Sequence, residues 1–344
     1  MRAARWYARG DVRVVDVPDP GAPPAGWLRL KVLACGLCGT DVEEYTAGPV
    51  MTPLTPHPLT GRCAPLTLGH EFVGVVEEAG AGAGFAPGDT VAVDGTMSCG
   101  NCDRCRAGRY NMCAVSGQLG QQGDGGLAEY ALAPASCCVA YAGIPATVAA
   151  FAEPLSVAVR AVSRGEVAPG ATVAVLGGGT VGLLTARVAV LAGASRVVVV
   201  EPHPHRRELA ARFGAEAVAP DGAADAVGAG MDVVFEAAGV PAVASTAVRL
   251  TARAGTTVLL SVFDADVAVP MMDLLLGEKR LVASLSHLRD TDFPRAVELL
   301  CSGAVDPTPL VSDRIGLADV VPRGLDALVA DPARHLKILV EPWE

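Results

Sequence analysis

The sequence predicts an α/β protein of two domains, in which a β-rich domain precedes a doubly wound parallel sheet with helices on both faces. Three observations point to this fold class. The chain has 344 residues, which is long enough for two buried cores. Up to about Ala150 short apolar runs alternate with turn residues. From Ala171, short Val-rich runs alternate with Ala- and Leu-rich stretches of helical length.

Composition excludes several classes of protein. The chain is 51% hydrophobic and 19% charged, which is typical of a compact globular protein rather than a disordered one. Its formal net charge of -10 gives no overall positive field, so we expect neither nucleic acid nor a membrane as a partner. The N-terminal residues lack a secretory signal pattern, and prolines and charges interrupt the most apolar stretch, 139–162. We therefore expect a cytoplasmic protein whose ten cysteines are thiols or metal ligands.

In the first domain, strand candidates are the apolar runs 12–17, 28–32, 72–77 and 90–93. Residues 45–65 are rich in proline and glycine and predict a long ordered loop. In the second domain, strand candidates are the runs 172–176, 196–200, 232–235 and 257–261. After about His287 the pattern is mixed again and ends in another strand candidate, 337–340.

A glycine-rich turn follows strand 172–176 and leads into the helical stretch 183–191. The turn comprises Gly177, Gly178, Gly179, Thr180, Val181 and Gly182, a G-x-G-x-x-G pattern in strand, turn and helix context. Gly177 permits the tight turn, Gly179 lets the backbone approach a pyrophosphate, and Gly182 lets the helix pack on the sheet. The helix N-terminus offers amide donors to the phosphates. The turn therefore predicts a dinucleotide site.

Glu201 ends the next strand, at about the 20-residue offset where an acid binds the ribose hydroxyls of NAD. A carboxylate there repels a 2′-phosphate, so NAD is favoured over NADP. Arg206 and Arg207 complicate this interpretation, because an arginine beyond the strand can accommodate that phosphate. The alternatives are that Glu201 is a solvated acid and that both arginines are solvated helix positions.

Four cysteines in a C-x2-C-x2-C-x7-C pattern predict a structural zinc site: Cys99, Cys102, Cys105 and Cys113. Four thiolates close the coordination shell, so we expect this lobe to stabilise a loop and to take no part in chemistry. An iron–sulfur cluster is the chief rival, but the bacterial ferredoxin spacing has a shorter last gap followed by proline. A nucleic-acid zinc ribbon conflicts with the acidic balance of the chain.

Three further candidates are Cys38, His70 and Glu153, in the segments Cys-Gly-Thr-Asp, Gly-His-Glu and Glu-Pro-Leu. Each alone is ambiguous, since a buried Cys or a lone His usually serves packing. Together, one thiolate, one imidazole and one carboxylate can hold zinc and leave a fourth position for water or substrate.

With these motifs in this order, the sequence resembles the zinc-dependent medium-chain alcohol dehydrogenases over nearly its whole length. The segment His57-Pro58-Leu59-Thr60-Gly61 before Gly69-His70-Glu71 resembles the 2,3-butanediol dehydrogenase branch, to which sorbitol, threonine and aminocyclitol dehydrogenases are close. The resemblance implies a GroES-like catalytic domain, 1–152 and 288–344, and a Rossmann NAD-binding domain, 153–287. The closing strand 337–340 belongs to the first domain on the same ground.

The resemblance also implies the roles of the site residues. Cys38, His70 and Glu153 are expected to bind the catalytic zinc, and Glu71 is either an outer acid or an alternative ligand. Thr40 is expected to hydrogen-bond the substrate oxygen. The implied reaction is reversible hydride transfer between a secondary alcohol and NAD, with zinc as the Lewis acid.

Two positions depart from the family pattern. Glu43 stands where the family usually has the histidine that ends a proton relay, and Arg160 replaces another usual histidine. Glu43 is therefore a candidate relay acid, and the alternative is a solvated acid beside Glu44.

The substrate stays open between a vicinal diol and a polyol, sugar alcohol, amino alcohol or aminocyclitol. A non-catalytic dinucleotide-binding protein is the alternative from another class. The strand near 281–285 resembles the segment through which family members pair, so we expect a homodimer or homotetramer.

Overall fold

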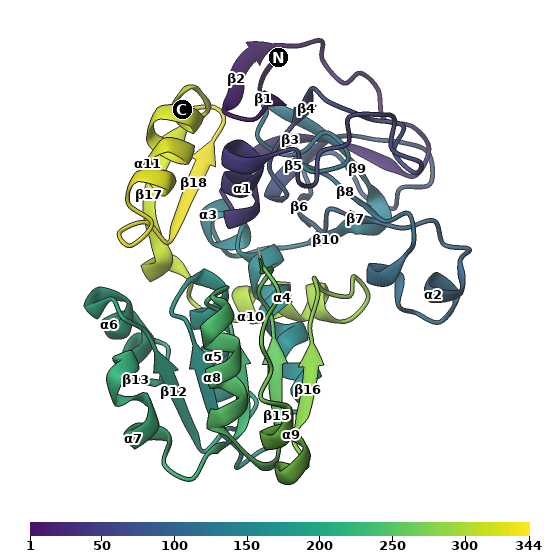
Figure 1. Cartoon of the computed structure of the whole chain (residues 1–344). Coiled ribbons are helices and arrows are strands. Elements are labelled where there is room, and N and C mark those ends of the chain that lie inside the picture. The colour runs from purple at the N-terminus through teal and green to yellow at the C-terminus, as the bar shows by residue number, and fades with distance from the viewer. Residues whose placement is uncertain (264) are drawn as a thin grey trace. The chain divides into compact units, whose positions relative to one another are not determined.

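The computed structural model describes residues 1–263 and 265–344, which divide into two compact units (Figure 1). Unit 1 comprises Met1–Glu153 and Leu288–Glu344, and unit 2 comprises Pro154–His287. The chain therefore leaves unit 1, builds unit 2, and then returns to unit 1.

Unit 1 is built mainly of β-strands. They are β1 (Arg2–Ala8), β2 (Asp11–Asp16), β3 (Trp27–Gly36), β4 (Leu66–Thr67), β5 (Glu71–Ala79), β6 (Thr90–Val93), β7 (Thr96–Met97), β8 (Gly117–Gln118), β9 (Tyr130–Pro134), β10 (Cys138–Ala140), β17 (Val311–Gly316) and β18 (Lys337–Glu341). The largest sheet has the order β10-β6-β5-β3-β18-β17, with β9 also paired to β3. Smaller sheets join β2-β1-β4 and β7-β8.

Strand β3 organises the largest sheet because it pairs antiparallel with β5, β9 and β18. Its alternate residues Leu28, Leu30 and Val32 are fully buried, as period-two patterning requires for a strand with one face on the core. Figure 1 shows the C-terminal strand β18, in yellow, beside the N-terminal part of the chain. The last strand of the chain thus lies next to an early strand, β3, in one sheet.

Helices of unit 1 are few and short. They are α1 (Gly39–Ala47), α2 (Asp103–Arg106), α3 (Ala146–Ala149), α10 (Asp292–Cys301) and α11 (Asp326–Ala330), with 3-10 turns at Tyr110–Met112, Ala135–Cys137, Thr308–Leu310 and Leu317–Asp319 and a π turn at Val320–Leu325. Helix α1 follows β3 directly, so the long central strand places the beginning of α1 next to β5.

Unit 2 holds a parallel sheet of six strands in the order β13-β12-β11-β14-β15-β16. The strands are β11 (Thr172–Leu176), β12 (Arg196–Val200), β13 (Glu216–Val218), β14 (Met231–Glu236), β15 (Thr251–Leu259) and β16 (Arg280–Ala283). The helices are α4 (Ala152–Arg164), which begins at the end of unit 1, α5 (Thr180–Leu191), α6 (Pro204–Arg212), α7 (Ala223–Val227), α8 (Pro241–Leu250) and α9 (Met271–Gly277), with a 3-10 turn at Pro220–Gly222. The strand order reverses between β11 and β14, where doubly wound sheets form their ligand crevice.

The observed elements correct one expected strand. The run 257–261 was expected to form a strand by itself, but β15 begins at Thr251 and ends at Leu259. The strand continues through an irregularity in its pairing with β14, where Ala254 has a φ of +61° and register shifts by several residues. Such a bulge interrupts the hydrophobic alternation, so the first half of β15 lacks a strand pattern.

One helical run, Ala146–Arg164, has the length and apolarity that a membrane span needs, and 61% of its apolar window is buried inside the protein. This run joins α3 and α4. A buried core helix satisfies the same criterion, so the run is weak evidence for a membrane. The expectation that membranes are not partners stays a prediction.

Candidate active site

Cys38 lies immediately before α1 and is fixed by the first turn of that helix. The Asp41 carboxylate accepts a hydrogen bond from the Cys38 backbone N–H at 2.9 Å, as acids near helix N-termini commonly do. The Cys38 thiol donates to the Thr40 hydroxyl oxygen, with Sγ and Oγ1 3.7 Å apart. The predicted Cys-Gly-Thr-Asp segment thus brings thiol, hydroxyl and carboxylate together on one turn.

His70 precedes β5 and is 3% exposed. Its Nδ1 lies 3.7 Å from Asp41 Oδ1, and no hydrogen-bond partner reaches this buried nitrogen in the described structure. Burial by itself lowers the pKa of His70, but the charges of Asp41 and Cys38 outweigh burial, and the pKa lies well above its ordinary value. The imidazole therefore lies in a negative environment that suits a bound cation.

Glu71, the first residue of β5, is held by a lysine from the far end of the chain. Lys337 Nζ donates to Glu71 Oε2 at 2.5 Å and to the Leu37 carbonyl at 2.9 Å, and both charged side chains are buried. Gly36 pairs with Glu71 across β3 and β5, and a Cβ at Gly36 would lie 2.2 Å from Glu71 Oε2. A side chain at position 36 would therefore displace this carboxylate from its place beside Lys337.

Cys38, His70 and Glu71 form one group whose donor atoms lie within 4.8 Å of one another. We call these three residues the mixed-ligand group. Glu153, in the first turn of α4, is not part of that group as described, but it is buried and its charge raises the pKa of Lys337. Burial lowers the pKa of Lys337, but the negative charges of Glu71 and Cys38 raise it. The pKa of Lys337 therefore lies above its ordinary value. A sulfur, a nitrogen and a carboxylate oxygen fit a zinc ion.

Glu43 and Glu44 are neighbours on α1 with opposite environments. Glu43, the candidate relay acid, is exposed. Glu44 is 3% exposed, and its carboxylate accepts backbone N–H groups from Val50, Met51 and Thr52. Sequence reasoning missed Glu44, although its spacing of three from buried Asp41 places both acids on the same face of the helix. Glu44 orders the start of the expected long loop.

The four predicted cysteines of the zinc lobe also converge. Their sulfurs lie within 4.8 Å of one another, with Cys102 to Cys105 at 3.5 Å and Cys99 to Cys105 at 4.0 Å. Four sulfurs at 2.3 Å from a tetrahedral zinc would lie about 3.8 Å apart, so the spacing fits that ion. Hydrogen bonds from Cys105, first from its backbone N–H, lower the pKa of Cys102 to about 6. Cys113 accepts the Cys99 N–H at 3.4 Å.

The glycine loop of unit 2 joins β11 to α5 as its motif predicts. Gly177 has a φ of +109°, and a Cβ there would lie 2.7 Å from the Ala237 carbonyl oxygen. A Cβ on Gly182 would lie 2.0 Å from the Gly177 oxygen, so the helix can approach the turn only with glycine. Gly179 caps α5 and has open space where a side chain would stand, and Thr180 and Val181 begin the helix. The loop fits a pyrophosphate at the helix N-terminus.

Glu201 follows β12 and points back to this loop. Its carboxylate accepts the Gly178 N–H at 2.6 Å and the His203 N–H at 2.9 Å. Arg206, on α6, is partly buried; burial lowers its pKa, and the Glu201 charge acts in the opposite direction. Arg207 donates to the Glu201 carbonyl oxygen at 2.8 Å. The Glu201 carboxylate therefore lies against the glycine loop.

Comparison with known families matches both parts of the chain. Residues 24–145 match the alcohol dehydrogenase GroES-like domain, and residues 180–302 match the zinc-binding dehydrogenase family. The (R,R)-butanediol dehydrogenase of Bacillus subtilis is 35% identical over 99% of this chain and 100% of its own length. The L-threonine 3-dehydrogenase of Pyrococcus furiosus is 34% identical over 87% of this chain and 86% of its own.

Solved structures give the same result. The crystal structure of 2R,3R-butanediol dehydrogenase from Bacillus subtilis has a TM-score of 0.92 at 33% identity and covers 99% of both chains. A zinc-binding dehydrogenase from Sinorhizobium meliloti 1021, bound to NADP, has a TM-score of 0.87 at 35% identity, also with 99% coverage of both chains. The chain belongs to the medium-chain alcohol dehydrogenase family and is a zinc-dependent, NAD(P)-linked oxidoreductase acting on CH–OH groups.

Proposed function

We propose that this enzyme interconverts a vicinal diol such as 2,3-butanediol and its hydroxyketone, with NAD as the hydride acceptor. The observation that carries the proposal is full-length similarity to (R,R)-butanediol dehydrogenases, including the His57–Gly61 segment that resembles this branch. The L-threonine 3-dehydrogenase relative supports an amino alcohol as the second candidate, because one metal site can serve both substrates. In this proposal unit 1 carries the chemistry and unit 2 binds the dinucleotide.

We propose that Cys38, His70 and Glu153 bind the catalytic ion and that Glu71 acts as the outer acid. Lys337 already neutralises Glu71 through a 2.5 Å contact, which makes that carboxylate a poorer partner for a cation. Glu153 is buried and its charge contributes to the raised pKa of Lys337, so it is the other acid in this environment that could supply the carboxylate ligand. Zinc analysis of Glu153→Gln and Glu71→Gln tests the assignment, since only the first variant is expected to lose one ion.

The residues of unit 1 have separate proposed tasks in the reaction. When bound, zinc supplies a Lewis acid for the substrate oxygen, and NAD accepts the hydride. Thr40 orients the substrate hydroxyl, since its own hydroxyl lies 3.7 Å from Cys38 Sγ. Asp41 holds the backbone of Cys38 and faces His70, so it positions both donors. Glu43 is the proposed outer acceptor of the substrate proton.

The proposed preference for NAD rests on Glu201. Its carboxylate lies at the glycine loop, where it would accept ribose hydroxyls and repel a 2′-phosphate. The partly buried Arg206 is the group that would favour NADP. We expect kcat/KM to be at least about 10-fold higher with NAD, and Glu201→Ala to narrow the difference. An equal or reversed preference in the wild type would transfer the role to Arg206.

A homodimer formed through the β16 edge of the unit 2 sheet is also proposed. Strand β16 is the last strand of the sheet, and the neighbouring helix α9 exposes apolar side chains. Between 63% and 69% of each of these is exposed: Met271, Met272, Leu275 and Leu276. An open edge beside an apolar patch is a typical surface for a second copy. Sedimentation of the wild type and Leu275→Glu tests this, because the variant is expected to be monomeric.

The substrate is tested by measuring NADH formation with stereoisomers of 2,3-butanediol, sorbitol, L-threonine and an aminocyclitol. We expect a 2,3-butanediol isomer to give the highest kcat/KM. A higher value with L-threonine would favour the amino-alcohol candidate. Absence of turnover with every substrate, in protein that holds its zinc, would favour the non-catalytic alternative.

A further inference from the structure

Unit 1 contains a cavity of about 720 Å³ that the proposed reaction does not use. Strand β9, the loops before β3 and β4, and the segment 119–125 contribute to its walls. The mixed-ligand group, Thr40 and Glu153 do not line it. The volume lies within the range of about 300–1,000 Å³ that small-molecule sites occupy. The cavity is therefore large enough for a second ligand.

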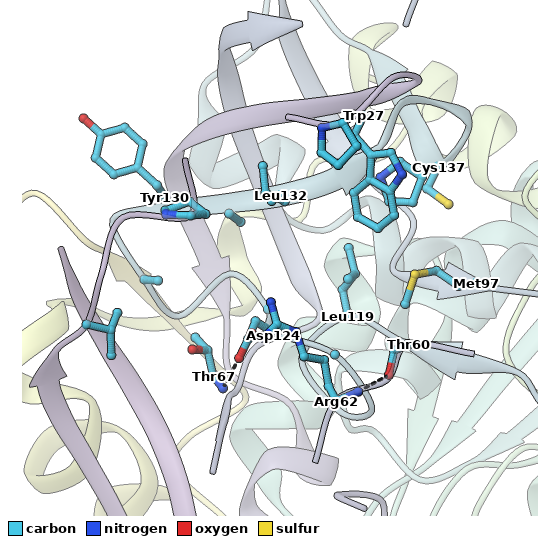
Figure 2. Close-up of a pocket in the computed structure, with 18 of the residues that line it drawn as sticks. Trp27, Thr60, Arg62, Thr67, Met97, Leu119, Asp124, Tyr130, Leu132 and Cys137 are labelled. Atoms are coloured by element: carbon cyan, nitrogen blue, oxygen red, sulfur yellow. Dashed lines mark hydrogen bonds and ion pairs between the residues drawn. The ribbon is translucent and has the colours of Figure 1, made fainter. Parts of the chain in front are cut away.

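One side of this cavity is apolar. Figure 2 shows Trp27 and Leu132 on one side, with Leu119 and Met97 lining the neighbouring wall. Trp27 begins β3, and Leu132 comes from β9, which pairs with β3, so the sheet holds these two side chains in place. An indole next to aliphatic side chains favours a flat or branched apolar group.

The opposite end is polar, but each acidic side chain of the lining already has an arginine partner. Figure 2 shows Thr60, Arg62, Thr67 and Asp124 together at this end. Asp124 accepts the Thr67 N–H at 3.1 Å and lies 3.5 Å from Arg62 Nε. The other acid of the lining, Asp19, lies 2.9 Å from an arginine outside it, Arg29. Neither acid therefore needs a cationic ligand.

Arg5 is a lining arginine that has no ion-pair partner among the described residues. It stands opposite Thr67 in the β1–β4 pairing and is partly buried. Its Nη2 donates to the Pro65 carbonyl, and its buried Nε has no hydrogen-bond partner. Among the described residues, no carboxylate lies within ion-pair distance of Arg5. A guanidinium in this position has donors that a planar anion could use.

We propose that this cavity binds a small organic carboxylate with an aromatic or branched apolar body. The carboxylate would pair with Arg5, and the apolar body would lie against Trp27 and Leu132. A second lining cation, Arg289, has its guanidinium 4.8 Å from the centre of the Tyr110 ring, and its ion-pair partner Asp290, 3.8 Å from Nε, does not line the cavity. The charge and the apolar wall lie in one cavity, so the ligand class is an amphipathic anion rather than the alcohol of the proposed reaction.

Calorimetric titration of the zinc-loaded full chain with 2-naphthoate and its neutral match, 2-naphthamide, tests the site. For a probe of this size we expect a Kd of about 1 mM or tighter for the acid. Arg5→Gln is expected to weaken 2-naphthoate binding by about 10-fold or more, because charged hydrogen bonds are lost, and to leave the amide unchanged. Arg5→Lys should retain part of the affinity, since the charge stays and the planar fork is lost.

Three controls locate the probe. Arg13→Gln removes the exposed arginine opposite Arg5 in the β1–β2 pairing and should leave binding unchanged. Cys38→Ala should also bind 2-naphthoate normally, which separates this cavity from the zinc site. Quenching of tryptophan fluorescence by 2-naphthoate should diminish in Trp27→Phe. Unaltered binding by Arg5→Gln, loss of binding in Cys38→Ala, or no binding by the wild type would each overturn the proposal.

Discussion

The two metal-ligand groups of unit 1 are built in different ways. The four-cysteine lobe takes all its donors from the single segment between Cys99 and Cys113, and its sulfurs receive backbone hydrogen bonds from that segment and from the adjoining Ala114. The mixed-ligand group takes its donors from the residue before α1 and from the start of β5, and Lys337, 266 residues from Glu71, pairs with its carboxylate. One site depends on local spacing, and the other depends on the register of a sheet.

The electrostatic surroundings of the two groups differ as well. Three of the four lobe cysteines are partly exposed. Hydrogen bonds from Cys105 lower the pKa of Cys102 to about 6, whereas burial and the Cys102 side chain raise the pKa of Cys105 to about 11. The mixed-ligand group is mostly buried, with Asp41 and Lys337 as charged neighbours. A closed sulfur site can stabilise a loop, whereas a buried mixed site can adjust the charge of a reacting group. The comparison therefore predicts that stability and catalysis can be disturbed separately.

The largest expected effect is on the lobe. Cys105→Ser should lose one zinc ion, and zinc binding in small structural sites corresponds to about 10 kcal/mol of local folding energy. The variant should be cleaved by protease between Cys99 and Cys113 and retain the ion of the mixed-ligand group. Metal analysis with limited proteolysis measures both. Loss of both ions would show that the two sites are not independent.

Cys38→Ala is the reciprocal change. It removes a proposed ligand and with it several kcal/mol of transition-state stabilisation, so kcat/KM should fall by about 10³-fold or more. The lobe should keep its zinc and its resistance to protease. Cys63→Ala, at a partly exposed cysteine outside both groups, is the matched control. If Cys38→Ala retained two ions, Cys38 would not be a ligand.

Lys337→Met removes the positive charge that pairs with Glu71 in the mixed-ligand group. Glu71 would remain buried without its partner, and removal of one member of a buried ion pair costs about 3–5 kcal/mol. A bound zinc ion would offset part of that cost, so the loss in Tm should be greater for the metal-free protein. The double variant Lys337→Met, Glu71→Gln should recover stability. Equal losses with and without zinc would contradict the placement of Glu71 beside the ion.

The smallest effects are expected from the two adjacent acids of α1. Glu43→Gln should slow alcohol oxidation at neutral pH by about 10-fold if the relay proposal holds, and the loss should shrink at high pH. Glu44→Gln should cost about 1–2 kcal/mol of stability, because a neutral amide accepts the loop N–H groups less strongly. An unchanged rate and pH profile for Glu43→Gln would leave solvent as the proton acceptor.

The sequence was most informative where structure is local. Strands Thr90–Val93, Thr172–Leu176 and Arg196–Val200 have the expected bounds, because their apolar runs end at turn residues. The glycine loop and the four-cysteine lobe were likewise readable from spacing. By contrast, the contact between Lys337 and Glu71 depends on how β18, β3 and β5 pair, which no short pattern encodes.

Other features escaped the sequence for the same reason. Glu44 looks like any helix acid until the loop folds back onto it. The irregular start of β15 hides half of that strand. The cavity beside Arg5 is formed by segments from several parts of unit 1, so its residues carry no common motif.

The position of β18 has a consequence for protein synthesis. This strand lies between β3 and β17 in the sheet of unit 1, yet it follows the whole of unit 2 in the chain. A ribosome therefore releases every residue of unit 2 before β3 can gain this neighbour. Until then the end of β3 at Cys35 and Gly36 lacks this strand partner, and Glu71 has no lysine beside it. The nascent enzyme can therefore place Lys337 beside its mixed-ligand group only after unit 2 has emerged.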